Sequence, residues 1–420
     1  MLKKLYILDV DIFSDIGGAG KAGYDIMIGM SYYYKIIFIP KYVAYKKMNN
    51  DNERILFRKH MNDLQNSGIF VPNILIELSH DAEVKYKKYL DIISKIIEED
   101  SIIMDLNYFP ELNPSSIAGV IRSFFYKGEI VSIKHTKKCR VITLLQTLDN
   151  RPIKSHIYFA LKSFSVCHFF DLKLLFKSLY RNIKDPISTK LLIKNADLIL
   201  VYSNGSIISL GQTRNKGKFR ILSIGNTINK DVYPKPKEKS NYIIFYSRLI
   251  YDKGLFDLLE IFRVILKKMD TRLIITGKFP TQQLESEFLD KAKRYNINDK
   301  IEYLGFVDAN ELQKLISNAK VFLYPSHYDS FPYAILEAIS SFTVVVTYSI
   351  PCILYSYQSL QCVYKIKEFD INNMAKKTIE ILNLSNDAYF ELFNDEKINE
   401  FINEHRDNKE NIKEICKFIL

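Results

Sequence analysis

The sequence lacks any apolar run long enough to cross a membrane as a helix. Such a helix needs ~18–20 consecutive apolar residues, and no stretch of the 420 residues approaches that length. The first 13 residues, MLKKLYILDVDIF, are basic and then apolar, but they include Asp9 and Asp11 and no small-residue cleavage site. We interpret them as a first strand and not as a signal peptide, and we expect a cytoplasmic protein.

Cysteines are also few, and none has a partner at the spacing of a metal or redox motif. The five lie scattered at Cys139, Cys167, Cys352, Cys362 and Cys416. This pattern favours a reducing compartment over a disulfide framework, and it disfavours structural zinc.

Length and charge bound the remaining classes. A chain of 420 residues, 47% hydrophobic and 25% charged, is typical of a globular protein with two domains. Residues 121–230 hold 20 Lys and Arg against 5 Asp and Glu, whereas the segments on either side are each slightly acidic. That excess favours an anionic partner such as lipid headgroups, a phosphorylated acceptor or nucleic acid. The alternative is a surface that is merely soluble.

Strands and helices are predicted to alternate along both halves of the chain. In the first half we predict strands at 5–10, 35–40, 74–78, 101–106, 140–145, 195–203 and 220–224, with helices at 49–68 and 86–99. In the second half we predict strands at 242–246, 272–276, 300–304, 320–324 and 344–346, with helices at 255–267, 310–317 and through most of 371–420. This alternation indicates two doubly wound α/β domains, and the polar, proline-containing residues 231–240 are the best linker.

Residues 324–347, YPSHYDSFPYAILEAISSFTVVVT, carry the strongest local signal. A buried strand breaks at Pro325, and a helix is expected to start near Pro332, because proline suits a first helical position. Asp329 in the loop and Glu337 in the helix can both line the cleft at the carboxyl ends of the strands. Free N–H groups at the helix start favour an anion there. The alternative is that both acids are ordinary helix-start or solvated residues.

Three further segments carry weaker signals. Arg248 and Lys253 follow the strand at 242–246 and could hold a phosphate, or they could be solvated loop cations. The glycine-rich residues 17–23 are neither a P-loop nor a dinucleotide fingerprint, and could be a plain tight turn. The basic and aromatic residues 158–184 could lie on a membrane surface or form a core helix pair. No nucleic-acid-reading signature is present.

In order along the chain, these motifs resemble glycosyltransferase family 4, whose fold is GT-B. The matching segments are Gly17-Gly18, Ala196-Asp197 with Ser203, the stretch SIGNTINKDVYP at 223–234, Ser247-Arg248-Leu249 with Lys253-Gly254, and Asp329 with Glu337 at the spacing of the family's paired acids. The resemblance implies two Rossmann-like domains with a cleft between them: residues 1–230 for the acceptor and 241–400 for the nucleotide sugar. Residues 401–420 are expected to form a helix that packs back on the first domain.

The resemblance also implies a reaction and its residues. The expected activity is a retaining, metal-independent, hexosyltransferase-type transfer from a nucleotide-diphosphate sugar, with no cofactor. Arg248, Lys253 and Asp329 are the expected catalytic residues. The expected donor-binding set is Gly17, Gly18, Phe306, Val307, Asp329, Ser330, Phe331 and Glu337. Within it, Asp329 would bind sugar hydroxyls, Glu337 the ribose, and Phe306 with Val307 the base.

The chain departs from the family pattern at several positions. Asp329 stands in place of a glutamate, Ser330 and Pro332 in place of glycines, and Gln146 where many members have histidine. These departures leave open a GT-B protein that binds nucleotide sugars with little or no activity. The basic segment leaves open nucleic-acid binding or modification. The expected partners are a nucleotide sugar and an anionic membrane surface or lipid-linked acceptor, at the inner face of the membrane.

Overall fold

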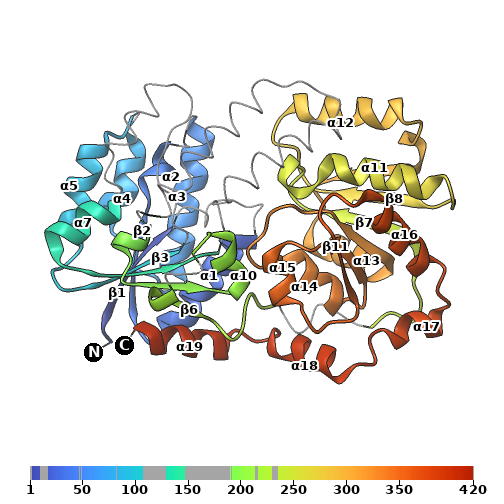
Figure 1. The fold of residues 1–420 in the computed structure, drawn as a ribbon. Helices are drawn as coiled ribbons and strands as arrows, with labels where there is room; N and C mark the ends of the chain where they lie inside the picture. The colour runs from blue at the N-terminus through green and yellow to red at the C-terminus, as the bar shows by residue number, and fades with distance from the viewer. Residues whose placement is uncertain are drawn as a thin grey trace.

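A computed structural model describes residues 2–9, 18–46, 48, 50–81, 83–106, 129–146, 190, 192–212, 216–228 and 235–419. Within these residues the chain forms two domains, each built on a six-stranded parallel sheet flanked by helices (Figure 1). The predicted pair of doubly wound α/β domains is therefore confirmed.

The sheet of the first domain has the strand order β2-β1-β3-β4-β5-β6. Its strands are β1 (Lys4–Asp9), β2 (Lys35–Pro40), β3 (Ile102–Leu106), β4 (Arg140–Leu144), β5 (Leu198–Val201) and β6 (Phe219–Ile221). Most residues of β1 to β5 are buried, as expected for parallel strands covered on both faces, whereas only Phe219 is buried in the edge strand β6. The helices are α1 (Gly18–Ser31), α2 (Tyr42–Lys46), α3 (Asp51–Asn66), α5 (Tyr86–Ile96), α7 (Glu129–Lys137) and α10 (Asn204–Ser209), with a 3₁₀ turn η3 (Lys216–Lys218).

One predicted strand in this domain is wrong. Residues 74–78 lie in the helix α4 (Asn73–Glu77), which continues into the 3₁₀ turn η2 (Leu78–His80). Pro72 caps the helix start, and only Leu75 of the five residues of α4 is buried. Periodicity alone cannot tell whether so short an apolar run forms a helix or a strand.

The second domain repeats the architecture with the strand order β12-β11-β10-β7-β8-β9. Its strands are β7 (Ser240–Tyr246), β8 (Arg272–Thr276), β9 (Ile301–Gly305), β10 (Ala319–Tyr324), β11 (Val344–Tyr348) and β12 (Val363–Ile366). Its helices are α11 (Leu255–Leu266), α12 (Gln282–Arg294), α13 (Ala309–Asn318), α14 (Tyr333–Ser340), α15 (Pro351–Ser356) and α16 (Ile371–Leu382), with 3₁₀ turns η5 (Tyr251–Lys253) and η6 (Asn298–Lys300).

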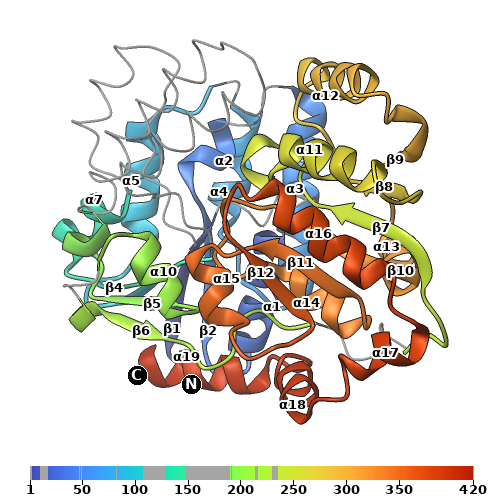
Figure 2. The same cartoon turned by 45° about the vertical axis from the view of Figure 1, so that its right-hand side comes forward.

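The last three helices lead back towards the first domain. They are α17 (Asn386–Glu391), α18 (Glu396–Glu404) and α19 (Lys409–Ile419), and α19 packs against α1 close to both chain ends (Figure 2). The guanidinium of Arg140, at the start of β4, donates 2.7 Å to the carbonyl of Ile419. The structure thus places the C-terminal helix on the first domain.

The two domains also meet where α10 packs against α15. A Cβ atom on Gly205 of α10 would lie 2.3 Å from the carbonyl oxygen of Pro351, so the close approach of the two helices requires glycine. This contact lies next to the loop that carries Asp329, because Tyr328 packs against the same apolar cluster as Cys352 of α15.

Candidate active site at the joined edges of the two sheets

Lys253, the last residue of η5, makes three polar contacts at the carboxyl edge of the second sheet. Its Nζ lies 2.7 Å from Oδ2 of Asp329. It also donates to the hydroxyl of Tyr324 and to the carbonyl of Tyr328, each at 3.0 Å. Because Lys253 follows β7 and Asp329 follows β10, the pairing joins the carboxyl ends of two adjacent strands.

A glycine explains how this turn comes so close to the loop. Gly254 has φ of 72°, in the left-handed region that favours glycine, and a Cβ there would lie 1.9 Å from the carbonyl oxygen of Pro325. Two residues earlier, the carbonyl of Asp252 accepts a hydrogen bond of 3.0 Å from the backbone N–H of His327. The turn at 252–254 and the loop at 325–329 therefore form one packed unit.

Tyr324 links the remaining charges. Its hydroxyl donates to Oδ2 of Asp329. Burial raises the pKa of Tyr324 well above its ordinary value, and the Asp329 carboxylate raises it further. The guanidinium charge of Arg248 acts on this pKa in the opposite direction. The structure thus brings together Arg248, Lys253 and Asp329, with Arg248 exposed at the end of β7.

Glu337 lies on the neighbouring helix and within electrostatic reach of this group. The predicted helix start near Pro332 is confirmed, because Pro332 is the N-cap of α14. The hydroxyl of Tyr357 donates 2.9 Å to the carbonyl of Pro332. Burial raises the pKa of Tyr357 well above its ordinary value, and the charges of Asp329 and Glu337 add to the effect. The charges of both acids therefore act on the same buried tyrosine.

Phe306 and Val307 follow β9, at the outer strand of the sheet. Phe306 is 64% exposed, so its ring is accessible. Its neighbour Gly305 accepts 2.8 Å from the N–H of Gly277. A Cβ on Gly277 would lie 2.0 Å from the carbonyl oxygen of Ser247. The carboxyl ends of β7, β8 and β9 are thus in contact, and Phe306 lies on the edge that carries Arg248.

Ser330 and Phe331 face the first domain. The hydroxyl of Ser330 donates 3.5 Å to the carbonyl of Leu145, at the end of β4. The Phe331 ring is parallel to the His405 ring, with centroids 5.5 Å apart. The ring also lies against Gly225, where a Cβ would lie 2.3 Å from it, and 5.8 Å from the Tyr202 ring between centroids. These two predicted donor-binding residues therefore form part of the contact between the domains.

The first domain presents buried charged groups at its own carboxyl edge. Lys41, just after β2, forms an ion pair with Asp105 of β3, and both side chains are almost fully buried. Burial raises the pKa of Asp105, and Lys41 partly offsets that effect. The sequence analysis missed this pair. The signal available was a charged residue within or directly after an apolar strand, in IIMDL and KIIFIPK.

Gln146 lies on this edge as well, after β4. Neither atom of its buried amide has a hydrogen-bond partner among the described residues. A Cβ on Gly23 of α1 would lie 2.8 Å from Oδ2 of Asp9 and 3.8 Å from Nε2 of Gln146. The end of β1, the end of β4 and α1 therefore converge around Gly23.

Several predictions fall on residues outside the described part of the chain. Gly17 is among them, as are residues 158–184 and residues 231–234 of the linker at 231–240. Gly18 is the first residue of α1. Among the described residues, no group of three or more His, Cys, Asp and Glu side chains is arranged to hold a metal ion. No helix within the described ranges is long and apolar enough to span a membrane.

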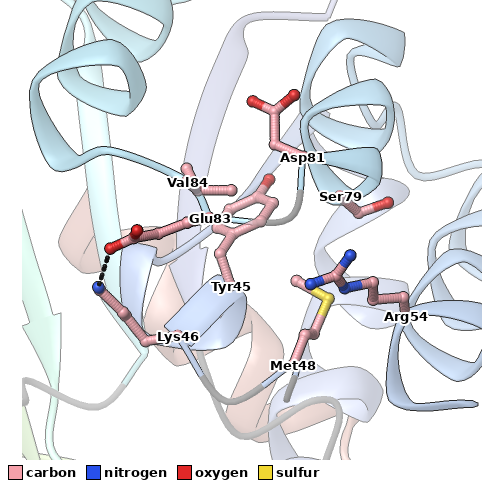
Figure 3. Close-up of a pocket in the computed structure, with 8 residues that line it drawn as sticks. All are labelled: Tyr45, Lys46, Met48, Arg54, Ser79, Asp81, Glu83 and Val84. Atoms are coloured by element: carbon pink, nitrogen blue, oxygen red, sulfur yellow. Dashed lines mark ion pairs between the residues drawn. The ribbon is translucent and has the colours of Figure 1, made fainter. Parts of the chain in front are cut away.

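A separate hollow of about 340 Å³ lies in the first domain, between α2, α3 and η2 (Figure 3). Its charged lining residues have partners nearby: Lys46 lies 3.8 Å from Glu83, and Asp81 accepts 2.7 Å from Lys88. None of the predicted site residues lines it. The hollow is therefore distinct from the edge on which those residues converge.

The GT-B class of folds consists of two α/β domains, each with a parallel sheet, which meet at the carboxyl edges of the two sheets. The crystal structure of Anabaena HepE in complex with UDP and glucose aligns over 99% of both chains with a TM-score of 0.65. Sequence identity in this alignment is 11%, so the likeness shows the fold alone.

The second domain carries a match to a protein family. Residues 228–401 match the family of glycosyl transferases group 1. Similar proteins include the uncharacterized glycosyltransferase YqgM of Bacillus subtilis, 25% identical over 162 residues, and an uncharacterized glycosyltransferase of Methanocaldococcus jannaschii, 31% identical over 114 residues. These matches span 38% and 27% of this chain, and 44% and 28% of the relatives. The chain thus spans less than half the length of either relative.

Proposed function

We propose that this protein is a retaining, metal-independent glycosyltransferase that uses a nucleotide-diphosphate sugar as donor. The observation that carries the proposal is the position of Lys253: a lysine 8% exposed, at the carboxyl edge of the second sheet, paired with Asp329 and close to Arg248. Ligands of open α/β sheets bind at this edge. The family of residues 228–401 and the UDP complex of a fold neighbour support a nucleotide sugar as the ligand.

In this proposal the two cations stabilise the leaving group. As the bond between the sugar's anomeric carbon and the diphosphate breaks, negative charge grows on the diphosphate oxygens. Lys253 and Arg248 neutralise that charge, and the start of α14 adds its dipole. The acceptor hydroxyl forms the new bond on the face that the diphosphate leaves and gives its proton to a departing diphosphate oxygen, so the anomeric configuration is retained. Because both cations are side chains, this step needs no metal.

The remaining side chains orient the donor. Asp329 binds the sugar hydroxyls and holds Lys253 in place before the donor arrives. Glu337 on α14 binds the ribose hydroxyls. Phe306 and Val307 contact the base, and the exposed Phe306 ring offers a face for stacking. Ser330 and Phe331 connect this donor site to the first domain, whose edge at Gln146 faces the acceptor.

The proposal is tested by screening UDP-, GDP- and ADP-sugars for stabilisation of the folded protein, followed by mass spectrometry of the products. For the active donor, Lys253→Ala and Arg248→Ala should each lower kcat by about 10²- to 10³-fold, the size typical of losing one charge-stabilising group. Lys300→Ala is the control, because Lys300 pairs with Asp270 at the opposite, amino end of β9. Full activity in both site variants would refute the assignment.

A binding protein without turnover is the alternative that the same screen resolves. The shorter acid at Asp329 and the glutamine at Gln146 motivate it. Stabilisation by a nucleotide sugar without transfer or hydrolysis would favour a binding protein.

An acceptor at an anionic surface is the second part of the proposal, supported by the basic excess of residues 121–230. Flotation with phosphatidylglycerol vesicles, but not with phosphatidylcholine vesicles, would support it.

A further inference from the structure

His327 is buried two residues before Asp329, and both of its ring nitrogens face carboxylates. Nδ1 lies 2.7 Å from Oε1 of Glu368, in the segment after β12. Nε2 lies 3.1 Å from Oδ2 of Asp257, in the first turn of α11. A neutral imidazole has one N–H and one lone pair, whereas an imidazolium has two N–H groups. Only the imidazolium can donate to both acids.

The surroundings hold the ring in this orientation. It contacts the rings of Tyr348, with centroids 5.1 Å apart, and Phe369, at 4.5 Å, and these two rings also contact each other. The Tyr348 hydroxyl donates 2.7 Å to the same Asp257 oxygen. Asp257 therefore accepts from two donors and is itself fixed in place.

The charges on all sides favour the protonated ring. Asp257 faces it from α11 and Glu368 from the segment after β12, and the Tyr348 hydroxyl on β11 binds the same Asp257 oxygen. Burial alone would lower the pKa of His327, but Asp257 and then Glu368 outweigh it and raise that pKa above its ordinary value.

His327 is connected to the donor site through both its backbone and its side chain. Through its backbone N–H, His327 binds the carbonyl of Asp252, the residue before Lys253. Through Asp257, the side chain holds the start of α11, which begins two residues after Lys253. Through the chain, it fixes the loop that carries Asp329. One charged ring thus sets the relative position of the turn and the loop.

We propose that His327, as an imidazolium, is a positioning residue that keeps Lys253 and Asp329 in register for a diphosphate. This inference rests on the proposed function, because it assumes that Lys253 is the diphosphate cation. His327 itself does not touch the ligand. It acts through the charge-assisted hydrogen bonds to Asp257 and Glu368, which pin three elements around the site.

The test uses His327→Gln, which keeps a donor but loses the charge. Affinities for inorganic pyrophosphate and UDP-glucose are measured by calorimetry from pH 6 to pH 9. We expect about 10- to 100-fold weaker binding in the variant, the range for losing hydrogen bonds to charged groups. The double variant His327→Gln/Glu368→Gln should recover part of the loss, because it removes the unpaired carboxylate together with the cation. The exposed His80→Gln is the matched control.

The pH profile separates positioning from mere packing. A histidine whose pKa is raised in the folded state makes its contribution at low pH and loses it as the pH rises through that value. Wild-type binding should weaken along this limb, and His327→Gln should lack the limb. Nitrogen-15 NMR of the ring should show both nitrogens protonated at neutral pH.

The outcomes that overturn the inference are distinct from failure of the proposed function. A neutral His327 ring at pH 7, or a folded His327→Gln protein that binds pyrophosphate as tightly as wild type, overturns the positioning role alone. Wild-type protein that binds neither pyrophosphate nor UDP-glucose overturns the proposed function, and the inference with it. Pyrophosphate binding that depends on His327 without UDP-glucose binding supports the inference and directs the donor search to other nucleotides.

Discussion

The carboxyl edges of the two sheets both carry a lysine–aspartate pair, but the two pairs differ in exposure. In the second domain the side chains of Lys253 and Asp329 are 10% and 15% exposed. In the first domain the side chains of Lys41 and Asp105 are 6% and 0% exposed. Both lysines are buried, but Asp329 is partly accessible, whereas Asp105 is sealed in the sheet edge.

This difference separates a functional pair from a structural one. A ligand anion can replace Asp329 at Lys253 only where solvent and ligand can enter. A sealed pair gains no ligand, and its two charges depend entirely on each other for compensation. We therefore expect opposite responses: the second-domain pair should matter most for binding, and the first-domain pair should matter most for stability.

The largest expected effect is on stability, in the first domain. Lys41→Met leaves the Asp105 carboxylate buried without its cation, which typically lowers the free energy of unfolding by about 3–5 kcal/mol. Urea denaturation measures this loss. The control is Lys46→Met, because Lys46 is half exposed and lies 3.8 Å from Glu83, a surface pair worth about 0–1 kcal/mol. Equal effects of the two variants would contradict the sealed character of the first pair.

The next effect concerns His405, which joins the two edges. Its Nε2 accepts from the N–H of Gly225, its Nδ1–H donates to the carbonyl of Phe401, and its ring stacks on Phe331. Burial lowers the pKa of His405 to about 4. Because the unfolded chain takes up this proton near its ordinary pKa, stability should fall as the pH drops from about 6.5 to about 4.

The size of that loss approaches roughly 3 kcal/mol at the acid end, from 1.36 kcal/mol for each pKa unit. Denaturant midpoints at successive pH values measure it. His405→Gln should flatten this part of the profile, and His80→Gln should leave it unchanged. A wild-type profile that is already flat between pH 6.5 and pH 4 would rule out a neutral His405 at the domain contact.

Lys253→Met, the counterpart of Lys41→Met, should be the milder substitution for stability. Asp329 keeps the Tyr324 hydroxyl as a donor and remains partly exposed, so we expect a loss of about 1–2 kcal/mol. Binding of UDP-glucose, in contrast, should be lost in this variant and retained in Lys41→Met protein that is still folded. Denaturation and calorimetry on the same two proteins decide this. A reversed order would mean that the exposure of the pairs does not predict their roles.

The sequence predicts the second-domain edge better than the first because that edge carries recognisable motifs. Lys253 and Asp329 are 76 positions apart, but each lies in a segment that matches a motif of the resembled family, and Pro332 has its own local signal as a helix start. Lys41 and Asp105 are 64 positions apart in sequence, and no pattern in either segment indicates that they pair. Only the parallel register, in which Leu8 of β1 pairs with Asp105, places them together.

The same argument explains the other errors and omissions. Residues 74–78 were assigned to a strand because a short apolar run has no readable period. His327 carries no recognisable signal in the sequence, since neither Asp257 nor Glu368 lies near it in sequence. The role of Ser330 and Phe331 at the domain contact depends on Leu145 and Gly225, which belong to the other half of the chain. Contacts between distant segments are what local patterns lack.

The smallest expected effect has the opposite sign and concerns Gln146. Its amide is buried without a hydrogen-bond partner among the described residues, and such a group typically lowers stability by about 1–3 kcal/mol. Gln146→Leu, similar in size and apolar, should therefore raise the free energy of unfolding by about 1 kcal/mol. The matched control is Gln65→Leu, because Nε2 of Gln65 donates 2.9 Å to the carbonyl of Val71. That substitution should lower stability by a similar amount.

If the amide of Gln146 is kept for an acceptor hydroxyl, the more stable variant should lose sugar transfer while donor hydrolysis continues. A Gln146→Leu protein that is less stable than wild type would show that the amide is bonded already, and the edge of the first domain would then be as fully paired as that of the second.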